Sequence, residues 1–325
     1  MARHTIPDFI ERAEPRQGNP HALVRPLAVS LALSLRPAQW TKNLIIFAAL
    51  LFGQRLLDGR SVLYAIAAFT IFCALSGAVY LVNDVVDREA DRSHPLKRSR
   101  PIASGEVSPA LAITTAAGLT LVALGAAWWL RPSFALIGGL YVALLVLYSG
   151  PLKHVVIIDV LTIAIGFALR TAAGAAAIAV PISHRLLILT VLLALFLALS
   201  KRRHELVLLA DAATSHRRSL QEYSPYLLDQ MIAVVTASTL VAYSFYAVNP
   251  ETVEKFHTNL LGLTVPFPLY GIFRYLYLVH QKEGGGSPAE MLLTDRPLLA
   301  CVAGWAIVVA FIIYGPVHSI PGLID

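Results

Sequence analysis

The chain has 325 residues, of which 57% are hydrophobic and only 14% are charged, against about 25% charged residues in an ordinary soluble domain. Together with a mean hydropathy of +0.66, this composition excludes a soluble globular protein and indicates a polytopic helical membrane protein. The net charge of +6 fits the Lys and Arg excess of cytoplasmic loops, so we expect no nucleic-acid binding. Cys73 and Cys301 both lie in apolar stretches, so neither a disulfide framework nor a thiolate metal site is expected.

The chain begins with a polar, arginine-containing segment, residues 1–36, that has no apolar core ahead of a cleavage site and does not resemble a signal peptide. Residues 26–35 at its end predict a short interfacial helix. We therefore expect a cytoplasmic N-terminal arm at 1–36, a transmembrane domain at 37–315 and a short C-terminal tail at 316–325.

Apolar runs long enough to cross about 30 Å of hydrocarbon predict nine spans. They lie near residues 43–57, 61–83, 110–130, 133–149, 155–180, 184–200, 227–248, 258–280 and 297–315. With nine spans, the N-terminus and the even-numbered loops share one side of the membrane, and most of the 26 lysines and arginines fall there. The positive-inside rule makes that side cytoplasmic. The expected fold is therefore an all-α polytopic protein of the cytoplasmic (inner) membrane, with nine transmembrane helices around a central cavity and a cytoplasmic polar cap.

The loop after the second predicted span carries more charge than topology requires. Four oxygen-bearing side chains lie there at helical spacing: Asn83, Asp84, Asp87 and Asp91. On a continuous helix the three carboxylates would share one face, where their repulsion costs stability unless a cation neutralises it. Oxygen ligands without nearby Cys or paired His suit Mg²⁺. The alternative is a solvated helix end whose acids alternate with arginines.

A short basic loop follows the acids and contains Lys97, Arg98 and Arg100. A carboxylate-bound metal beside a basic loop suits a diphosphate group, because the metal contacts some of the oxygens and the cations donate charge-assisted hydrogen bonds to the rest. Taken alone, the same cations would be ordinary positive-inside charge.

The fifth predicted span contains two charged residues, Asp159 and Arg170, about three turns apart on one helix face. Intramembrane charges are candidates for function, and Arg170 is placed to hold a phosphate headgroup. The alternative is that Asp159 and Arg170 satisfy each other or neighbouring spans. Tyr148 and Lys153, at the mouth of the preceding loop, are weaker candidates, because a single lysine in a short loop is usually topological.

A second polar segment follows the sixth predicted span and is mainly cationic, with Lys201, Arg202 and Arg203 ahead of Glu205. Such a cationic segment favours direct binding of a phosphate group without a metal ion of its own. The alternative is a set of cytoplasmic anchors whose charged ends reach water past apolar surface.

Several of these segments resemble a known family. The motif NDxxDxxxD at residues 83–91, followed by RSRPIASGEVS at 98–108, resembles the UbiA superfamily of intramembrane prenyltransferases. RPAQWTKN at 36–43 and SKRRHEL at 200–206 resemble its decaprenyl-phosphate phosphoribosyltransferase branch. The resemblance covers about 36–315.

The resemblance implies transfer of 5-phosphoribose from phosphoribosyl pyrophosphate to a long polyprenyl phosphate, with release of pyrophosphate, on the cytosolic side of the lipid bilayer. It assigns catalysis to Asp84, Asp87 and Asp91, and Mg²⁺ binding to these three and Asn83. We expect the following substrate-binding residues: Lys42, Asn83, Lys97, Arg98, Arg100, Tyr148, Lys153, Arg170, Lys201, Arg202 and Glu205. A homo-oligomer is compatible with the sequence.

Two other functions remain open at this stage. Aromatic prenyltransferases of the superfamily move an isoprenoid from its diphosphate to a small acceptor and carry a second aspartate-rich motif after the sixth span. Here Glu205 and Asp211 are the only acids in that segment, which disfavours this alternative. A transporter or channel would spread its buried charges along a transmembrane path, whereas these charges gather in loops on one side.

Overall fold

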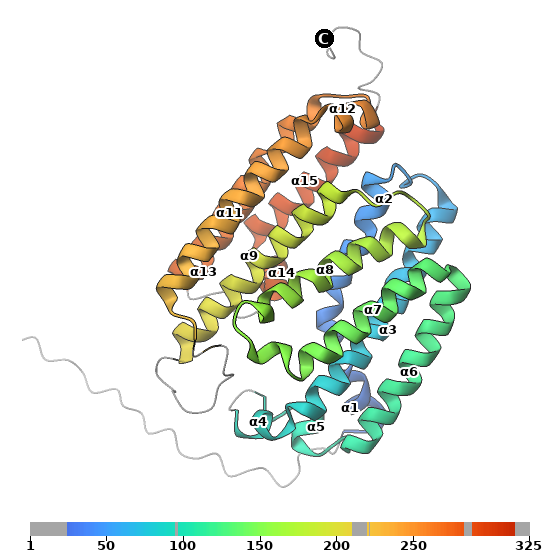
Figure 1. Cartoon of the computed structure of the whole chain (residues 1–325), viewed down its shortest axis with the longest axis vertical. Helices are drawn as coiled ribbons and strands as arrows, with labels where there is room; N and C mark the ends of the chain where they lie inside the picture. Colours follow the sequence, from blue (N-terminus) through green and yellow to red (C-terminus); the bar gives the residue numbers. More distant parts are fainter. Residues whose placement is uncertain (1–24, 95–96, 210–219, 221, 283–287, 316–325) are drawn as a thin grey trace, which may run out of the picture.

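The computed structural model describes residues 25–94, 97–209, 220, 222–282 and 288–315, and every element in this part of the chain is helical (Figure 1). The expected tail and most of the expected arm lie outside the described residues. The elements are α1 Leu27–Ser34, η1 Pro37–Phe47, α2 Ala48–Phe52, α3 Gly59–Val86, α4 Arg88–Ser93, α5 Pro101–Ser104, α6 Pro109–Leu130, α7 Pro132–Ser149, η2 Leu152–His154, α8 Ile158–Ala177, α9 His184–Leu209, α11 Pro225–Val248, α12 Pro250–Phe256, η3 Leu260–Thr264, α13 Pro266–Gln281, α14 Pro288–Thr294 and α15 Arg296–Tyr314.

Seven of the described helices, α3, α6, α7, α8, α9, α11 and α15, are long and apolar enough to span a membrane. They coincide with seven of the nine predicted spans, so the membrane class is confirmed and the count of nine is not. The run at 43–57 is divided between the 3₁₀ helix η1 and the five-residue α2. The run at 258–280 is divided between η3 and the 16-residue α13, where Pro266 and Pro268 lack the N–H that a continuous helix would use.

Polar caps fix where several spans begin. The Asp58 carboxylate accepts the N–H groups of Arg60 and Ser61 at the start of α3. The side chains of Ser108, Ser224 and Asp295 do the same for α6, α11 and α15, and each of these three helices has proline in its first turn. Such caps satisfy donors that the first turn leaves unpaired, so the polar residues between apolar runs set the register of the spans.

The 3₁₀ helix η1 packs between α3 and α8. A Cβ atom at Gly174 of α8 would lie 2.2 Å from the carbonyl oxygen of Ile46, so only glycine permits this approach. The contact places the polar side chains of η1 inside the bundle, and Asn43 is fully buried there. The start of the first predicted span, at Asn43, therefore lies in the interior of the bundle.

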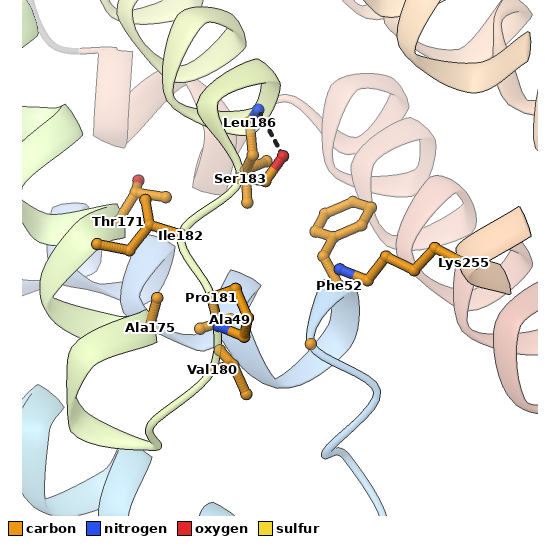
Figure 2. A pocket seen from close by; sticks show the side chains of 11 residues that line it. Ala49, Phe52, Thr171, Ala175, Val180, Pro181, Ile182, Ser183, Leu186 and Lys255 are labelled. Atoms are coloured by element: carbon orange, nitrogen blue, oxygen red, sulfur yellow. Dashed lines mark hydrogen bonds between the residues drawn. The ribbon is translucent and has the colours of Figure 1, made fainter. Parts of the chain in front are cut away.

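The two ends of the bundle are formed by different elements. The α4 and α5 helices lie at one end, and α12 and the end of α2 lie at the other (Figure 1). The far end holds a cavity of about 20 Å³, lined mainly by apolar side chains such as Phe52 and Pro181, with Lys255 at its edge (Figure 2). That volume holds about one water molecule, so it does not suit a phosphorylated substrate. The candidate site lies at the α4 and α5 end, which carries Asp84, Asp87 and Asp91.

Candidate active site

The acidic motif lies at the junction of two helices. Helix α3 ends at Val86, Asp87 lies between the helices, and α4 begins at Arg88. The single continuous helix expected through Asp91 is therefore interrupted at Asp87. Asp84 and Asp91 are each only 3% exposed, whereas Asp87 is half-buried.

Two of the three carboxylates converge on one guanidinium group. The Nη1 atom of Arg100 lies 2.5 Å from Oδ2 of Asp91 and 3.4 Å from Oδ1 of Asp84. Arg36, which precedes η1, forms a second ion pair with Asp84. Removing one partner from such a buried arrangement leaves an uncompensated charge, so the cations stabilise acids that would otherwise repel each other.

The third carboxylate points elsewhere. Asp87 forms an ion pair with the buried Lys153 of η2 and accepts a hydrogen bond from the Asn83 amide, with Nδ2 and Oδ2 3.1 Å apart. The break between α3 and α4 therefore separates Asp87 from the point where Asp84 and Asp91 meet. Lys153, a weak candidate from sequence, lies in direct contact with the acidic motif.

The donor set can be compared with the needs of Mg²⁺. Among the described residues, no three His, Cys, Asp or Glu side chains are arranged to hold a metal ion, so the four predicted ligands are not gathered about one point. Mg²⁺ in proteins is usually held by one or two carboxylates and completes its coordination with water and substrate phosphates. Asp84 and Asp91, which already meet at one cationic nitrogen, fit that requirement.

The basic loop is tied to the acidic motif by Arg88 and Arg92, the two arginines that alternate with the acids of the motif. Nε of Arg88 donates to the carbonyl of Ile102, 3.3 Å away, and Nε of Arg92 donates to that of Ala103, 3.0 Å away. These bonds hold α5 against α4. The predicted phosphate ligands of the loop lie nearby in sequence, with Lys97 half-buried and Arg98 exposed.

The second polar segment is partly committed to contacts within the protein. Arg202 is buried, and its Nε lies 2.8 Å from Oδ2 of Asp159, its Nη1 2.6 Å from Oε2 of Glu205 and its Nη2 3.1 Å from the hydroxyl of Tyr148. All three guanidinium nitrogens thus have protein partners. Asp159 therefore pairs with a residue of a neighbouring helix and not with Arg170, so only the second form of the alternative left open by the sequence applies to it.

Lys201 and Arg203, on either side of Arg202 in the sequence, differ in exposure and in ion-pair partner. The Lys201 ammonium lies 3.8 Å from Oε1 of Glu205, and 41% of its side chain is exposed. Arg203 pairs with Asp229 of α11, at 2.5 Å, and His280 of α13 also contacts that carboxylate, at 3.3 Å. Lys201 is therefore the cation of this segment best exposed to a soluble substrate.

Arg170 has neutral partners and is only 4% exposed. Its Nε donates to Oδ1 of Asn43 at 2.8 Å, its Nη1 to the carbonyl of Gly166 at 3.2 Å and its Nη2 to the hydroxyl of Tyr141 at 2.6 Å. Among the described residues it forms no ion pair with a carboxylate. Its positive charge is therefore solvated by dipoles and remains uncompensated, which favours an anion nearby.

Lys42 lies close to the same region. Its side chain is half-buried, and the positive charges of Arg170 and Arg36 act on its ammonium group. The sequence prediction included Lys42 and Arg170 but missed Asn43 and Tyr141, whose side chains orient Arg170. The signal for Asn43 was available, because it is an amide at the edge of an apolar run and belongs to the RPAQWTKN segment.

Comparison with known proteins agrees with this geometry. The UbiA prenyltransferase family matches residues 42–294, and the chain belongs to that family. It is 32% identical over 321 residues to the decaprenyl-phosphate phosphoribosyltransferase of Mycolicibacterium smegmatis, with 94% of this chain and 97% of the relative covered. It is 33% identical over 287 residues to the protein of the same name from Mycobacterium tuberculosis H37Rv, with 86% and 92% covered. The predicted resemblance is confirmed.

The fold is also shared with solved structures. A UbiA homolog from Archaeoglobus fulgidus bound to DMAPP and Mg²⁺ superimposes with a TM-score of 0.67 at 17% identity, covering 87% of this chain and 99% of that one. At this identity the likeness shows the arrangement of helices and nothing about individual side chains.

Proposed function

We propose that this protein transfers 5-phosphoribose from phosphoribosyl pyrophosphate to the phosphate of a long polyprenyl phosphate and releases pyrophosphate. The observation that carries the proposal is the presence of two cationic regions of different kinds. One is interleaved with the carboxylates of Asp84, Asp87 and Asp91, and the other surrounds Arg170 without acids. The names of the relatives in Mycolicibacterium smegmatis and Mycobacterium tuberculosis support the same reaction.

The acidic region suits the pyrophosphate of the donor. Asp84 and Asp91 would hold Mg²⁺, with Asp87 and Asn83 beside them. When bound, the ion would neutralise the charge that develops on the leaving pyrophosphate. Arg36, Arg100 and Lys153 now pair with these carboxylates, and they can donate charge-assisted hydrogen bonds to phosphate oxygens instead. Lys97, Arg98 and Lys201 would contact the 5-phosphate.

The region around Arg170 suits the phosphate of the lipid. Arg170 lies within a spanning helix, so a phosphate bound there could keep its polyprenyl chain among apolar side chains. Asn43 and Tyr141 fix the guanidinium, and Lys42 adds a second charge. The acceptor is already an anion and needs little general base, but it must be desolvated and held in line with the anomeric carbon.

One of the predicted substrate ligands, Arg202, is better described as a support. Arg202 uses its guanidinium on Asp159, Glu205 and Tyr148, so it would orient Tyr148 and Glu205 toward the substrate.

We further infer the placement in the membrane. A 3₁₀ helix rises about 2.0 Å per residue and an α-helix about 1.5 Å, so η1 with α2 reaches about 30 Å and can complete one crossing. With η3 and α13 as another, the chain would cross nine times. The charged end would then face the cytosol across the inner membrane, as the positive-inside rule predicts.

The test is incubation of the purified protein with Mg²⁺, labelled phosphoribosyl pyrophosphate and decaprenyl phosphate, followed by organic extraction. A labelled phosphosugar lipid is expected, and the Asp84→Asn variant should form none. A parallel incubation supplies geranylgeranyl diphosphate and an aromatic acceptor, the substrates of the alternative UbiA-type prenyltransferase. Turnover in that incubation alone would overturn the proposal and leave the family assignment intact.

A further inference from the structure

A strained turn joins the two polar regions of the site. Ile157, immediately before α8, has φ +69° and ψ −45°, a combination that is unfavourable for a β-branched residue. The N–H of Ile158 donates to the carbonyl of Val156, with N and O 2.8 Å apart. This pattern is a three-residue γ-turn of the positive-φ type, which is rare and persists only where the surroundings impose it.

One buried hydroxyl supplies that constraint. Tyr223, in the segment that leads into α11, accepts the N–H of Ile157 at 2.7 Å and donates its own proton to Oδ1 of Asp159 at 2.9 Å. Tyr223 is buried and Asp159 is fully buried. Burial, partly opposed by the hydrogen bond from Ile157, raises the pKa of Tyr223 to about 12, so the hydroxyl keeps the proton that it donates.

The turn connects two groups with separate roles. On its N-terminal side is Lys153, which pairs with Asp87 of the acidic motif. On its C-terminal side is Asp159, which holds Arg202 of the second polar segment at 2.8 Å. The backbone conformation at Ile157 therefore determines how these two parts of the site are placed relative to each other.

We propose that Tyr223 and Asp159 are positioning residues, which hold the strained turn at Ile157 and thereby place Lys153 and, through Arg202, the side chains of Tyr148 and Glu205 for the sugar donor. This inference rests on the proposed function for its substrate. Neither residue contacts the donor; both act through the turn. The region around Arg170 lies farther along α8 and does not depend on the turn.

The test removes only the hydroxyl, with Tyr223→Phe. The matched control is Tyr226→Phe, because Tyr226 is also near the start of α11 but is 75% exposed. We expect Tyr223→Phe to raise the KM for phosphoribosyl pyrophosphate about tenfold, because the turn loosens when both hydrogen bonds of the hydroxyl are lost. The KM for polyprenyl phosphate should stay the same, and the control should match wild type in both.

A second substitution tests the strain itself. Glycine adopts positive φ without penalty, so in an Ile157→Gly background the further change Tyr223→Phe should alter the donor KM by only about twofold. If Tyr223→Phe raises both KM values equally and Ile157→Gly does not suppress the effect, Tyr223 is only a stability residue and the inference is overturned.

Amide hydrogen exchange separates this inference from the proposed function. In Tyr223→Phe, the Ile157 amide should exchange faster than in wild type whatever the substrate is, because its acceptor has been removed. Unchanged exchange at Ile157 would overturn the positioning role. Faster exchange in a protein that does not use phosphoribosyl pyrophosphate would support the role of the turn and would overturn the proposed substrate.

Discussion

Replacing Arg100 by glutamine should change metal binding in opposite directions with and without pyrophosphate. Nη1 of Arg100 contacts both Asp91, at 2.5 Å, and Asp84, at 3.4 Å, so a divalent cation bound by these carboxylates must displace it. Charge-assisted hydrogen bonds contribute about 1.5–3 kcal/mol. Because 28% of the Arg100 side chain is exposed, solvent screening reduces the expected gain to about 1–2 kcal/mol. Arg100→Gln should therefore bind a metal ion alone about 5–30-fold more tightly.

With pyrophosphate present, wild type should bind the metal ion more tightly than Arg100→Gln does. Once the metal neutralises the carboxylates, Arg100 can donate to phosphate oxygens, and glutamine cannot supply that charge. The metal–pyrophosphate complex should therefore bind Arg100→Gln more weakly than wild type, by a factor of similar size. Mn²⁺ titration followed by electron paramagnetic resonance measures both constants without turnover. Arg60→Gln is the control, since Arg60 is an exposed arginine at the start of α3, away from the acidic motif at its end. Equal Mn²⁺ affinity in wild type and Arg100→Gln would show that Arg100 does not occupy the metal position.

Three further predictions test the division of the site. Arg170→Met should raise the KM for polyprenyl phosphate at least tenfold and leave that for phosphoribosyl pyrophosphate unchanged, since one buried charge contact is lost; equal effects on both constants would contradict two separate anion sites. Asp84→Asn and Asp91→Asn should each abolish Mn²⁺ binding in the same titration, whereas Asp87→Asn should weaken it only a few-fold because Asp87 faces Lys153. A larger loss of Mn²⁺ affinity in Asp87→Asn than in the other two variants would refute the assignment. Lys42→Met should raise the KM for polyprenyl phosphate and leave that for phosphoribosyl pyrophosphate unchanged, since the second positive charge near Arg170 is lost; equal effects on both constants would exclude Lys42 from the lipid-phosphate region.

The sequence was sufficient for the class of protein and for the location of the acidic motif. Long apolar runs identified the seven spanning helices because a span needs little more than length and hydropathy. The sequence was less informative at 43–57 and 258–280, where hydropathy alone cannot distinguish a continuous α-helix from a 3₁₀ helix followed by a short α-helix. The close approach of Ile46 to Gly174, which brings η1 into the bundle, depends on a residue far away in the chain.

Pairing between charged side chains was the least predictable feature. Helical spacing placed Asp159 and Arg170 on one face, but the eleven residues between them amount to about 16 Å along the helix, too far for a direct ion pair. The actual partner of Asp159 is Arg202 on another helix, and no one-dimensional pattern reports such a contact. The same holds for Asp87, because the interruption between α3 and α4 turns its carboxylate toward Lys153.

The pattern of pairing explains how one membrane protein can receive two anions at adjacent sites. Three carboxylates near the end of a span would be costly if left unpaired, and Arg36, Arg100 and Lys153 neutralise them before any substrate is bound. In the proposed function those cations would change partners when a metal replaces them, so this region would accept an anion only together with a cation. Arg170 differs, because its partners are an amide, a carbonyl and a phenol, and none of them cancels its charge. In the proposed function it would attract a lipid phosphate directly, so the acceptor would need no metal ion while the donor would.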